Sequence, residues 1–73
     1  MENKLKEARE YYENKHPNER MSKTELARRV GVSRQTISLI ESGVTVPKVD
    51  LAIRIARTLK VQRIDSIFIL PTA

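Results

Sequence analysis

The sequence predicts an all-α fold in which five short helices form one compact domain over residues 1–73. Apolar residues recur every three or four positions along most of the chain, which is the spacing that places them on one face of a helix. Serine, glycine and proline residues stand between these segments, where helices begin and end. A chain of 73 residues has room for one hydrophobic core and for no second domain.

The stretch over residues 22–43 predicts two short helices joined by a tight turn. Ser22 is a suitable N-cap, and Glu25 three residues later completes the sequence pattern of a capping box. Gly31 ends the first of these helices because glycine adopts the left-handed conformation without steric cost, and Ser33 caps the second. The inward apolar positions and the closing residues are Leu26, Ala27, Val30, Val32, Ile37, Ile40, Ser42 and Gly43. This arrangement is the helix-turn-helix layout.

Four short motifs stand at fixed offsets in this stretch: LA at residues 26–27, G at 31, SRQTIS at 33–38 and IESG at 40–43. With them, residues 23–43 resemble the helix-turn-helix of the Cro/CI-type (xenobiotic-response-element) repressor family. The resemblance extends upstream to residues 5–9 and downstream as far as Phe68. It implies a five-helix, lambda-repressor-like domain with a helix-turn-helix core over residues 22–43 and double-stranded DNA as its partner.

The segment before this core predicts a first helix over residues 3–15. Its inward stripe is formed by Leu5, Ala8 and Tyr12. Pro17 stops the helix, because proline cannot continue it and restricts the residue before it. Between Arg9 and Ser22 the chain is longer than the usual family spacing, so either the first helix or the connection after it is extended. We expect a longer first helix and then a loop over residues 17–21, with Met21 folded back on the core.

The segment after the core predicts a fourth helix over residues 48–59, beginning next to Pro47, where a missing N–H costs little. Its inner face is formed by Leu51, Ala52, Ile55, Ala56 and Leu59. The family often ends this helix with glycine, whereas this chain has Lys60, which predicts a strained or altered cap. Ile64, Ile67 and Phe68 then predict a short fifth helix, followed by a short strand or an extended tail.

The charge distribution favours a polyanionic partner. The net charge is +5 and the pI is about 10.0, and six of the nine acidic residues lie before residue 26. Between Arg28 and Lys60 only Glu41 and Asp50 oppose seven basic residues, so the basic excess lies on and after the helix-turn-helix. Arg28 and Arg29 can face either the DNA backbone or solvent.

The composition argues against several other classes of protein. Without cysteine, the chain has no disulfide, thiolate zinc site or cysteine nucleophile, and its single histidine has no acid–base partner at catalytic spacing. We expect no enzyme activity, no metal or cofactor and no small-molecule substrate. No apolar run approaches the roughly 20 residues of a membrane span. We expect a cytoplasmic protein, prokaryotic or phage-encoded, with no membrane partner.

The resemblance also implies which residues touch DNA. The helix over residues 33–42 is expected in the major groove, and its base-contacting residues are Arg34, Gln35, Ser38 and Leu39. Arginine suits guanine and glutamine suits adenine, whereas Leu39 has only an apolar surface to offer a thymine methyl group. The residues expected to contact phosphate are Lys23, Ser33, Thr36, Ser42, Val44 (through its N–H) and Lys48.

Two further expectations concern assembly. In the family, an arginine of the first helix reaches the glutamate that precedes the glycine closing the third helix, and here that structural pair is Arg9 and Glu41. Four consecutive apolar residues near the end of the chain require burial, so a C-terminal segment over about residues 62–73 predicts a homodimer seam. The residues of that seam are Ile64, Ile67, Phe68, Ile69 and Leu70.

The sequence therefore predicts a homodimeric transcriptional repressor that reads an inverted-repeat operator. Two alternatives use the same domain: an antitoxin or restriction-modification controller, each with a partner protein, and an interaction adaptor that has lost DNA binding. The adaptor is disfavoured because Arg34 and Gln35 suit the groove and Lys23 and Lys48 suit phosphate.

Overall fold

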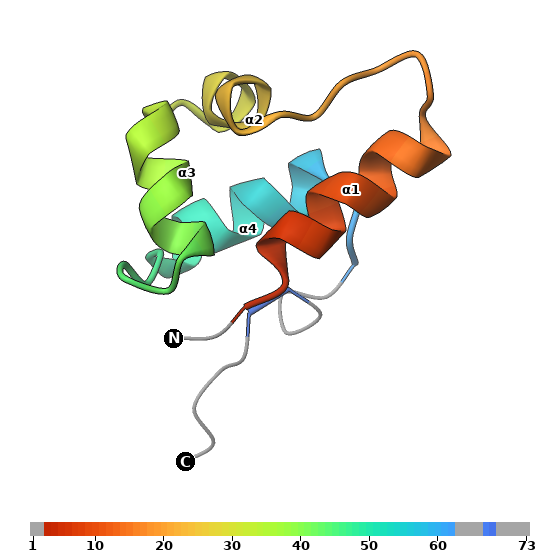
Figure 1. Cartoon of the computed structure of the whole chain (residues 1–73). Helices are drawn as coiled ribbons and strands as arrows, with labels where there is room; N and C mark the ends of the chain where they lie inside the picture. Colours follow the sequence, from red (N-terminus) through yellow and green to blue (C-terminus); the bar gives the residue numbers. More distant parts are fainter. Residues whose placement is uncertain (1–2, 63–66, 69–73) are drawn as a thin grey trace.

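The computed structural model describes residues 3–62 and 67–68 and is all-helical in this part, as predicted (Figure 1). Its elements are α1 (Leu5–Lys15), α2 (Lys23–Val30), α3 (Arg34–Glu41) and α4 (Val49–Thr58). In the described part, no helix is long and apolar enough to cross a membrane. Figure 1 shows α3 at one end of the molecule, the C-terminal end of α1 at the other, and α4 running between them.

The five-helix count is not confirmed, because the described residues contain four helices. Ile64 lies outside them, whereas Phe68 forms an isolated antiparallel bridge with Asn3. The N–H of Lys4 donates to the carbonyl oxygen of Ile67 at 2.6 Å, and both Ile67 and Phe68 are 1% exposed. This pairing therefore satisfies an amide at the start of α1 while it buries two large apolar side chains.

The helix ends of the predicted core are confirmed. The Oγ of Ser22 accepts from the N–H of Glu25, and the Oγ of Ser33 accepts from the N–H of Thr36, each at 3.1 Å. Both serines have extended backbone, which is the usual N-cap geometry. Gly31 ends α2 with φ of 82° in the left-handed region, so the turn into α3 depends on a residue without a Cβ.

The start of α1 differs from the prediction, because the helix begins at Leu5 and not at Asn3. The side chain of Asn3 makes two contacts instead. Its Oδ1 accepts from the N–H of Leu5 at 3.1 Å, and its Nδ2 donates to the carbonyl oxygen of Ile40 at 2.7 Å. Asn3 thus caps the beginning of α1 and the end of α3 together.

The core lies where the four helices and residues 67–68 meet. Its fully buried members include Met21, so the expected return of the loop to the core is confirmed. The buried apolar residues are Leu5, Tyr12, Met21, Leu26, Ala27, Val30, Ile37, Ile40, Ala52, Ile55, Ala56, Leu59, Ile67 and Phe68. Because α2 and α3 pack on each other and α2 packs on α4, the outward face of α3 is held on a rigid base.

The end of α4 has the altered cap that the sequence predicts. The helix ends at Thr58, and Lys60 has φ of 58°, the one positive φ of a non-glycine residue in the described ranges. A side chain with a Cβ is strained in this region, and glycine is not.

Candidate nucleic-acid interface

Helix α3 has one buried and one open face. Ile37 and Ile40 point into the core and are fully buried. The residues on the opposite face of the helix are Gln35, Ser38, Leu39 and Ser42, with Arg34 at its edge, as the helical period of 3.6 requires. All four predicted base-contacting residues are therefore accessible, and the large apolar side chain of Leu39 remains 36% exposed.

The first turn of α3 carries two long polar side chains at the end that would lead into a groove. Arg34 and Gln35 are exposed directly after the Ser33 cap. Within the described residues, neither side chain makes a hydrogen bond, and Arg34 forms no ion pair. Both therefore keep their full donor capacity for a ligand.

The predicted phosphate contacts lie at helix ends. Lys23 is the first residue of α2 and half-buried, and Lys48 is the exposed N-cap residue of α4. The hydroxyls of Ser33 and Thr36 are 2.9 Å apart, and the Oγ of Ser42 donates to the carbonyl oxygen of Leu39 at 3.0 Å. These hydroxyls are held by local contacts but lie near the protein surface.

The N–H of Val44, which is expected to contact phosphate, is engaged within the chain in this structure. That N–H donates to the carbonyl oxygen of Leu39 at 3.0 Å, and the N–H of Thr45 donates to the same oxygen at 3.2 Å. The carbonyl groups at the end of a helix lack partners within it, and here the following turn supplies them. The amide of Val44 is consequently engaged within the chain.

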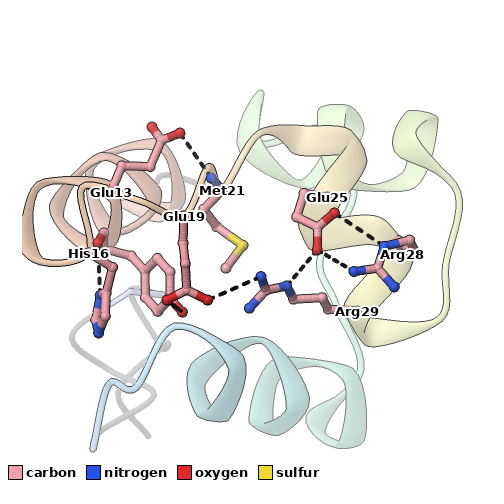
Figure 2. Close-up of polar contacts among 8 residues, drawn as sticks. Glu13, His16, Glu19, Met21, Glu25, Arg28 and Arg29 are labelled. Carbon is pink, nitrogen blue, oxygen red and sulfur yellow. Dashed lines mark hydrogen bonds and ion pairs between the residues drawn. The ribbon is translucent and has the colours of Figure 1, made fainter.

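The two arginines of α2 are bound to a carboxylate. The carboxylate of Glu25 accepts from the Nε of Arg28 at 3.1 Å and from the Nε of Arg29 at 2.6 Å (Figure 2). Hydrogen bonds from Arg28 and Arg29 lower the pKa of Glu25 from 4.5 to about 2. The carboxylate of Glu25 is thus engaged by these two arginines, and it partly neutralises their charge.

The loop between α1 and α2 is fixed by polar contacts that sequence analysis did not find. The carboxylate of Glu13 accepts from the N–H of Met21 at 2.9 Å, and the hydroxyl of Tyr12 donates to Glu19 at 3.1 Å. Glu19 also faces Arg29 (Figure 2), and its Oε1 lies 3.6 Å from the Nη2 of Arg29. These residues carry no motif, since an acidic residue near a helix end is common on any surface. Together they hold the loop, and so the start of α2, against α1.

The predicted pair of Arg9 and Glu41 is present. The Nε and Nη2 of Arg9 donate to the two carboxylate oxygens of Glu41 at 3.1 and 3.0 Å, and the side chains are only 11% and 8% exposed. The Nη1 of Arg9 also donates to the carbonyl oxygen of Met21 at 3.0 Å. One guanidinium therefore links α1, the loop before α2 and the last residue of α3.

Comparison with known proteins assigns this geometry to a family. The helix-turn-helix family model matches residues 18–65, which contain α2, α3 and α4. The chain belongs to the Cro/CI-type helix-turn-helix family. As a member of this family it is a DNA-binding regulator of transcription.

Relatives of this helix-turn-helix protein occur in archaea. An uncharacterized HTH-type transcriptional regulator of Methanocaldococcus jannaschii is 44% identical over 69 residues, which cover 94% of this chain and 92% of the relative. One of Methanothermobacter thermautotrophicus is 52% identical over 50 residues, or 68% of this chain and 72% of the relative. A third, of Archaeoglobus fulgidus, is 47% identical over 49 residues, or 67% of this chain and 68% of the relative.

A solved structure shares the fold. The crystal structure of a transcriptional regulator from Listeria innocua matches all of this chain with a TM-score of 0.63. The chain spans 66% of that regulator's length and is 19% identical to it, so this likeness concerns the fold alone.

In this helix-turn-helix protein, two residues of the predicted dimer seam lie elsewhere than expected. Ile67 and Phe68 are buried in the core of their own chain, next to their backbone pairing with residues 3–4. They offer no surface to a second copy. Ile64, Ile69 and Leu70 lie outside the described residues, and their role in a seam stays a prediction.

Proposed function

We propose that this regulator is a homodimeric repressor that reads an inverted-repeat operator through the major groove of DNA. The observation that carries the proposal is the open face of α3, where Arg34 and Gln35 keep free donors beside the accessible Ser38 and Leu39. An α-helix fits the major groove, where each base pair presents a distinct pattern of donors and acceptors.

The base-reading chemistry follows from these side chains. Arg34 is suited to a bidentate contact with O6 and N7 of guanine, and Gln35 to one with N6 and N7 of adenine. Leu39 offers a thymine methyl group an apolar surface, and Ser38 offers one hydroxyl. Each good bidentate contact discriminates against the wrong base by about 1–3 kcal/mol.

Phosphate contacts set the register of α3 without reading sequence. Lys23 and Lys48 are the principal candidates, because Lys23 begins α2, which packs on α3, and Lys48 precedes α4, which follows α3 in the chain. Backbone N–H groups at the start of a helix also attract anions. The hydroxyls of Ser33, Thr36 and Ser42 are close enough to the surface to add weaker contacts. The bound arginines of α2 contribute less, since Glu25 partly neutralises them.

Two copies related by a two-fold axis would place their recognition helices one turn of DNA apart, about 34 Å, so that the target is an inverted repeat. A regulator that occupies a promoter in this way blocks polymerase, which is the simplest route to repression. Its place of action is then the cytoplasm, where a prokaryotic chromosome lies.

Selection of bound duplexes from a random library tests this proposal. We expect enrichment of an inverted repeat with half-site centres about one helical turn apart. Retention that depends on salt but enriches no sequence would contradict specific recognition. No retention at all would favour the interaction adaptor.

The base contacts are tested by a single substitution. Arg34→Ala is expected to relax the choice at one guanine of each half-site by about 1–3 kcal/mol, with the other positions unchanged. A preference matrix measured with the variant and the wild type checks this. An unchanged matrix would mean that another residue reads that position.

A further inference from the structure

Leu39 is an apolar residue on the open face of α3, and packing does not account for it. Ile37 and Ile40, on the opposite side of the helix, are fully buried and join α3 to the core, whereas Leu39 is 36% exposed. Leu39 does not belong to the partly buried apolar residues that pack against this core in the described chain, which are Ala8, Val32, Leu51 and Val61. Its side chain is therefore available to a ligand.

The backbone at Leu39 is held in place. Its carbonyl oxygen accepts from the N–H groups of Val44 and Thr45 at 3.0 and 3.2 Å and from the Oγ of Ser42 at 3.0 Å. Three donors from the following residues thus fix the point from which the Leu39 side chain leaves the helix. A side chain presented from a fixed backbone loses less freedom on binding than one on a mobile loop.

The nearest neighbours of Leu39 on this face are short and polar. Ser38 precedes it, and Ser42, nearly one turn later, donates its hydroxyl to the Leu39 carbonyl oxygen. The two long polar side chains, Arg34 and Gln35, stand at the leading end of the helix, a turn or more away. A base that meets Leu39 therefore meets an apolar surface bordered by small hydroxyl groups.

An apolar side chain distinguishes the pyrimidine bases by one group. In the major groove thymine presents the O4 acceptor and the C5 methyl group, whereas cytosine presents its N4 amino donor and has only hydrogen on C5. Leu39 has no atom that can bond to O4 or to the amino group, so the C5 methyl group is the one feature that it can contact favourably. 5-Methylcytosine carries the same methyl group on the same ring carbon, directed into the same groove. Leu39 therefore has no means of telling 5-methylcytosine from thymine.

We propose that Leu39 makes this regulator a reader of the pyrimidine C5 methyl group, so that its affinity for an operator responds to methylation of cytosine. The inference deepens the proposed function and rests on it, since it requires α3 in the major groove. The ligand that it adds is duplex DNA with 5-methylcytosine at the position that faces Leu39. An operator with cytosine there binds more weakly, and methylation of that cytosine strengthens binding by the contact of one methyl group.

The expected size of the effect follows from the burial of one methyl group. Moving such a group from water into apolar contact changes an equilibrium constant by about fourfold. The effect should be the same on either pyrimidine, because the methyl group is the same and Leu39 bonds to no other part of the base. Two ratios of affinity, thymine over uracil and 5-methylcytosine over cytosine, are therefore expected to be equal, at about four each.

The test uses the wild-type chain and the duplex selected from the random library. Each thymine of one half-site is replaced in turn by uracil, which lacks the methyl group. The position with the largest loss is then rebuilt as a cytosine–guanine pair and as a 5-methylcytosine–guanine pair. We expect uracil to weaken binding about fourfold and methylation of the cytosine to strengthen it about fourfold. The four duplexes separate the methyl group from the base pair, because each pair is measured with and without it.

Two variants assign the effect to a side chain. Leu39→Asn keeps the size and branching of the side chain but removes its apolar surface, and should bring both ratios close to one. Ser38→Ala alters the adjacent residue and should keep both ratios, whatever its effect on the affinity itself. Circular dichroism and the Tm show whether each variant is folded, and the wild-type ratios test the inference even where a variant is not.

Three outcomes overturn the inference and leave the proposed function intact. Uracil that binds as well as thymine at every position would mean that no methyl group is contacted. A loss with uracil but no gain with 5-methylcytosine would mean that another feature of thymine is read. Both ratios unchanged in Leu39→Asn would assign the methyl contact to another residue. If the library yields no enriched sequence at all, the proposed function itself fails, and that result is distinct from the other three.

Discussion

At the scale of single residues, Arg9 links several parts of the fold, because its guanidinium donates to the carboxylate of Glu41 and to the carbonyl oxygen of Met21. Arg9→Ala leaves a nearly buried carboxylate without its cation, and removal of one partner of a buried pair costs about 3–5 kcal/mol. We expect a loss of at least about 3 kcal/mol in the free energy of unfolding, measured by urea denaturation. The double variant Arg9→Met, Glu41→Leu removes both charges and should recover much of it. Equal instability of both variants would show that the packing of Arg9 matters more than its charge.

A second residue-scale prediction concerns Lys60, whose left-handed backbone carries a Cβ. A non-glycine residue in this region is strained by about 1–2 kcal/mol, whereas glycine loses about 0.5–1 kcal/mol through the greater freedom of the unfolded chain. Lys60→Gly should therefore stabilise the protein by about 0.5–1 kcal/mol, seen as a Tm higher by a few degrees. Lys60→Ala keeps the strain and is the control. A lower Tm for the glycine variant would contradict this reading.

At the scale of elements, α2 predicts a pH dependence through Glu25. Its pKa is about 2 in the folded chain and 4.5 ordinarily, because Arg28 and Arg29 bind its charged form. A depressed folded pKa means that the unfolded state binds the proton more readily. The stabilisation by Glu25 is therefore complete above about pH 4.5 and is lost as the pH falls toward 2. Glu25→Gln should flatten the dependence of Tm on pH in this window and leave its slope above pH 6 unchanged. Parallel curves for the variant and the wild type would contradict this assignment.

At this scale, a contact could be predicted when its two residues lie close together in the sequence. Caps such as Ser22 and Ser33 were predictable, since their partners lie three residues away and follow from helix geometry alone. The capping box predicted for Glu25 is only half formed, because its carboxylate binds Arg28 and Arg29 one turn later instead of the N–H of Ser22. Local sequence does not separate these two partners, since both lie within one helical turn of Glu25. The role of Asn3, which reaches Ile40, depends on the tertiary fold and has no local signal. The sequence predicts that the apolar end of the chain needs burial. It does not predict that Ile67 and Phe68 are buried within their own chain, next to Asn3.

In the candidate site, too, features fixed by local helix geometry were predictable and features fixed by the tertiary fold were not. The open face of α3 was predictable because the buried Ile37 and Ile40 fix which side of the helix faces solvent. The partner of the Val44 N–H could not be predicted, because the N–H of a turn can bind either an outside anion or a helix carbonyl, and only the fold shows that it donates to the carbonyl oxygen of Leu39. Its contact with phosphate stays a prediction.

At the scale of the whole molecule, the proposed assembly predicts how salt acts on binding. Each phosphate contact adds about 0.9 to the slope of log affinity against log salt for duplex DNA. Lys48→Ala removes one such contact from each copy, so the slope should fall by about 1 on a duplex with one half-site and by about 2 on one with two. Lys15→Ala removes the same charge from the end of α1 that Figure 1 shows far from α3, and should leave both slopes unchanged. A fall of about 1 on both duplexes would mean that only one copy binds through Lys48, because two symmetric copies must lose two contacts. An equal effect of both lysines would instead assign the salt dependence to the net charge of the chain.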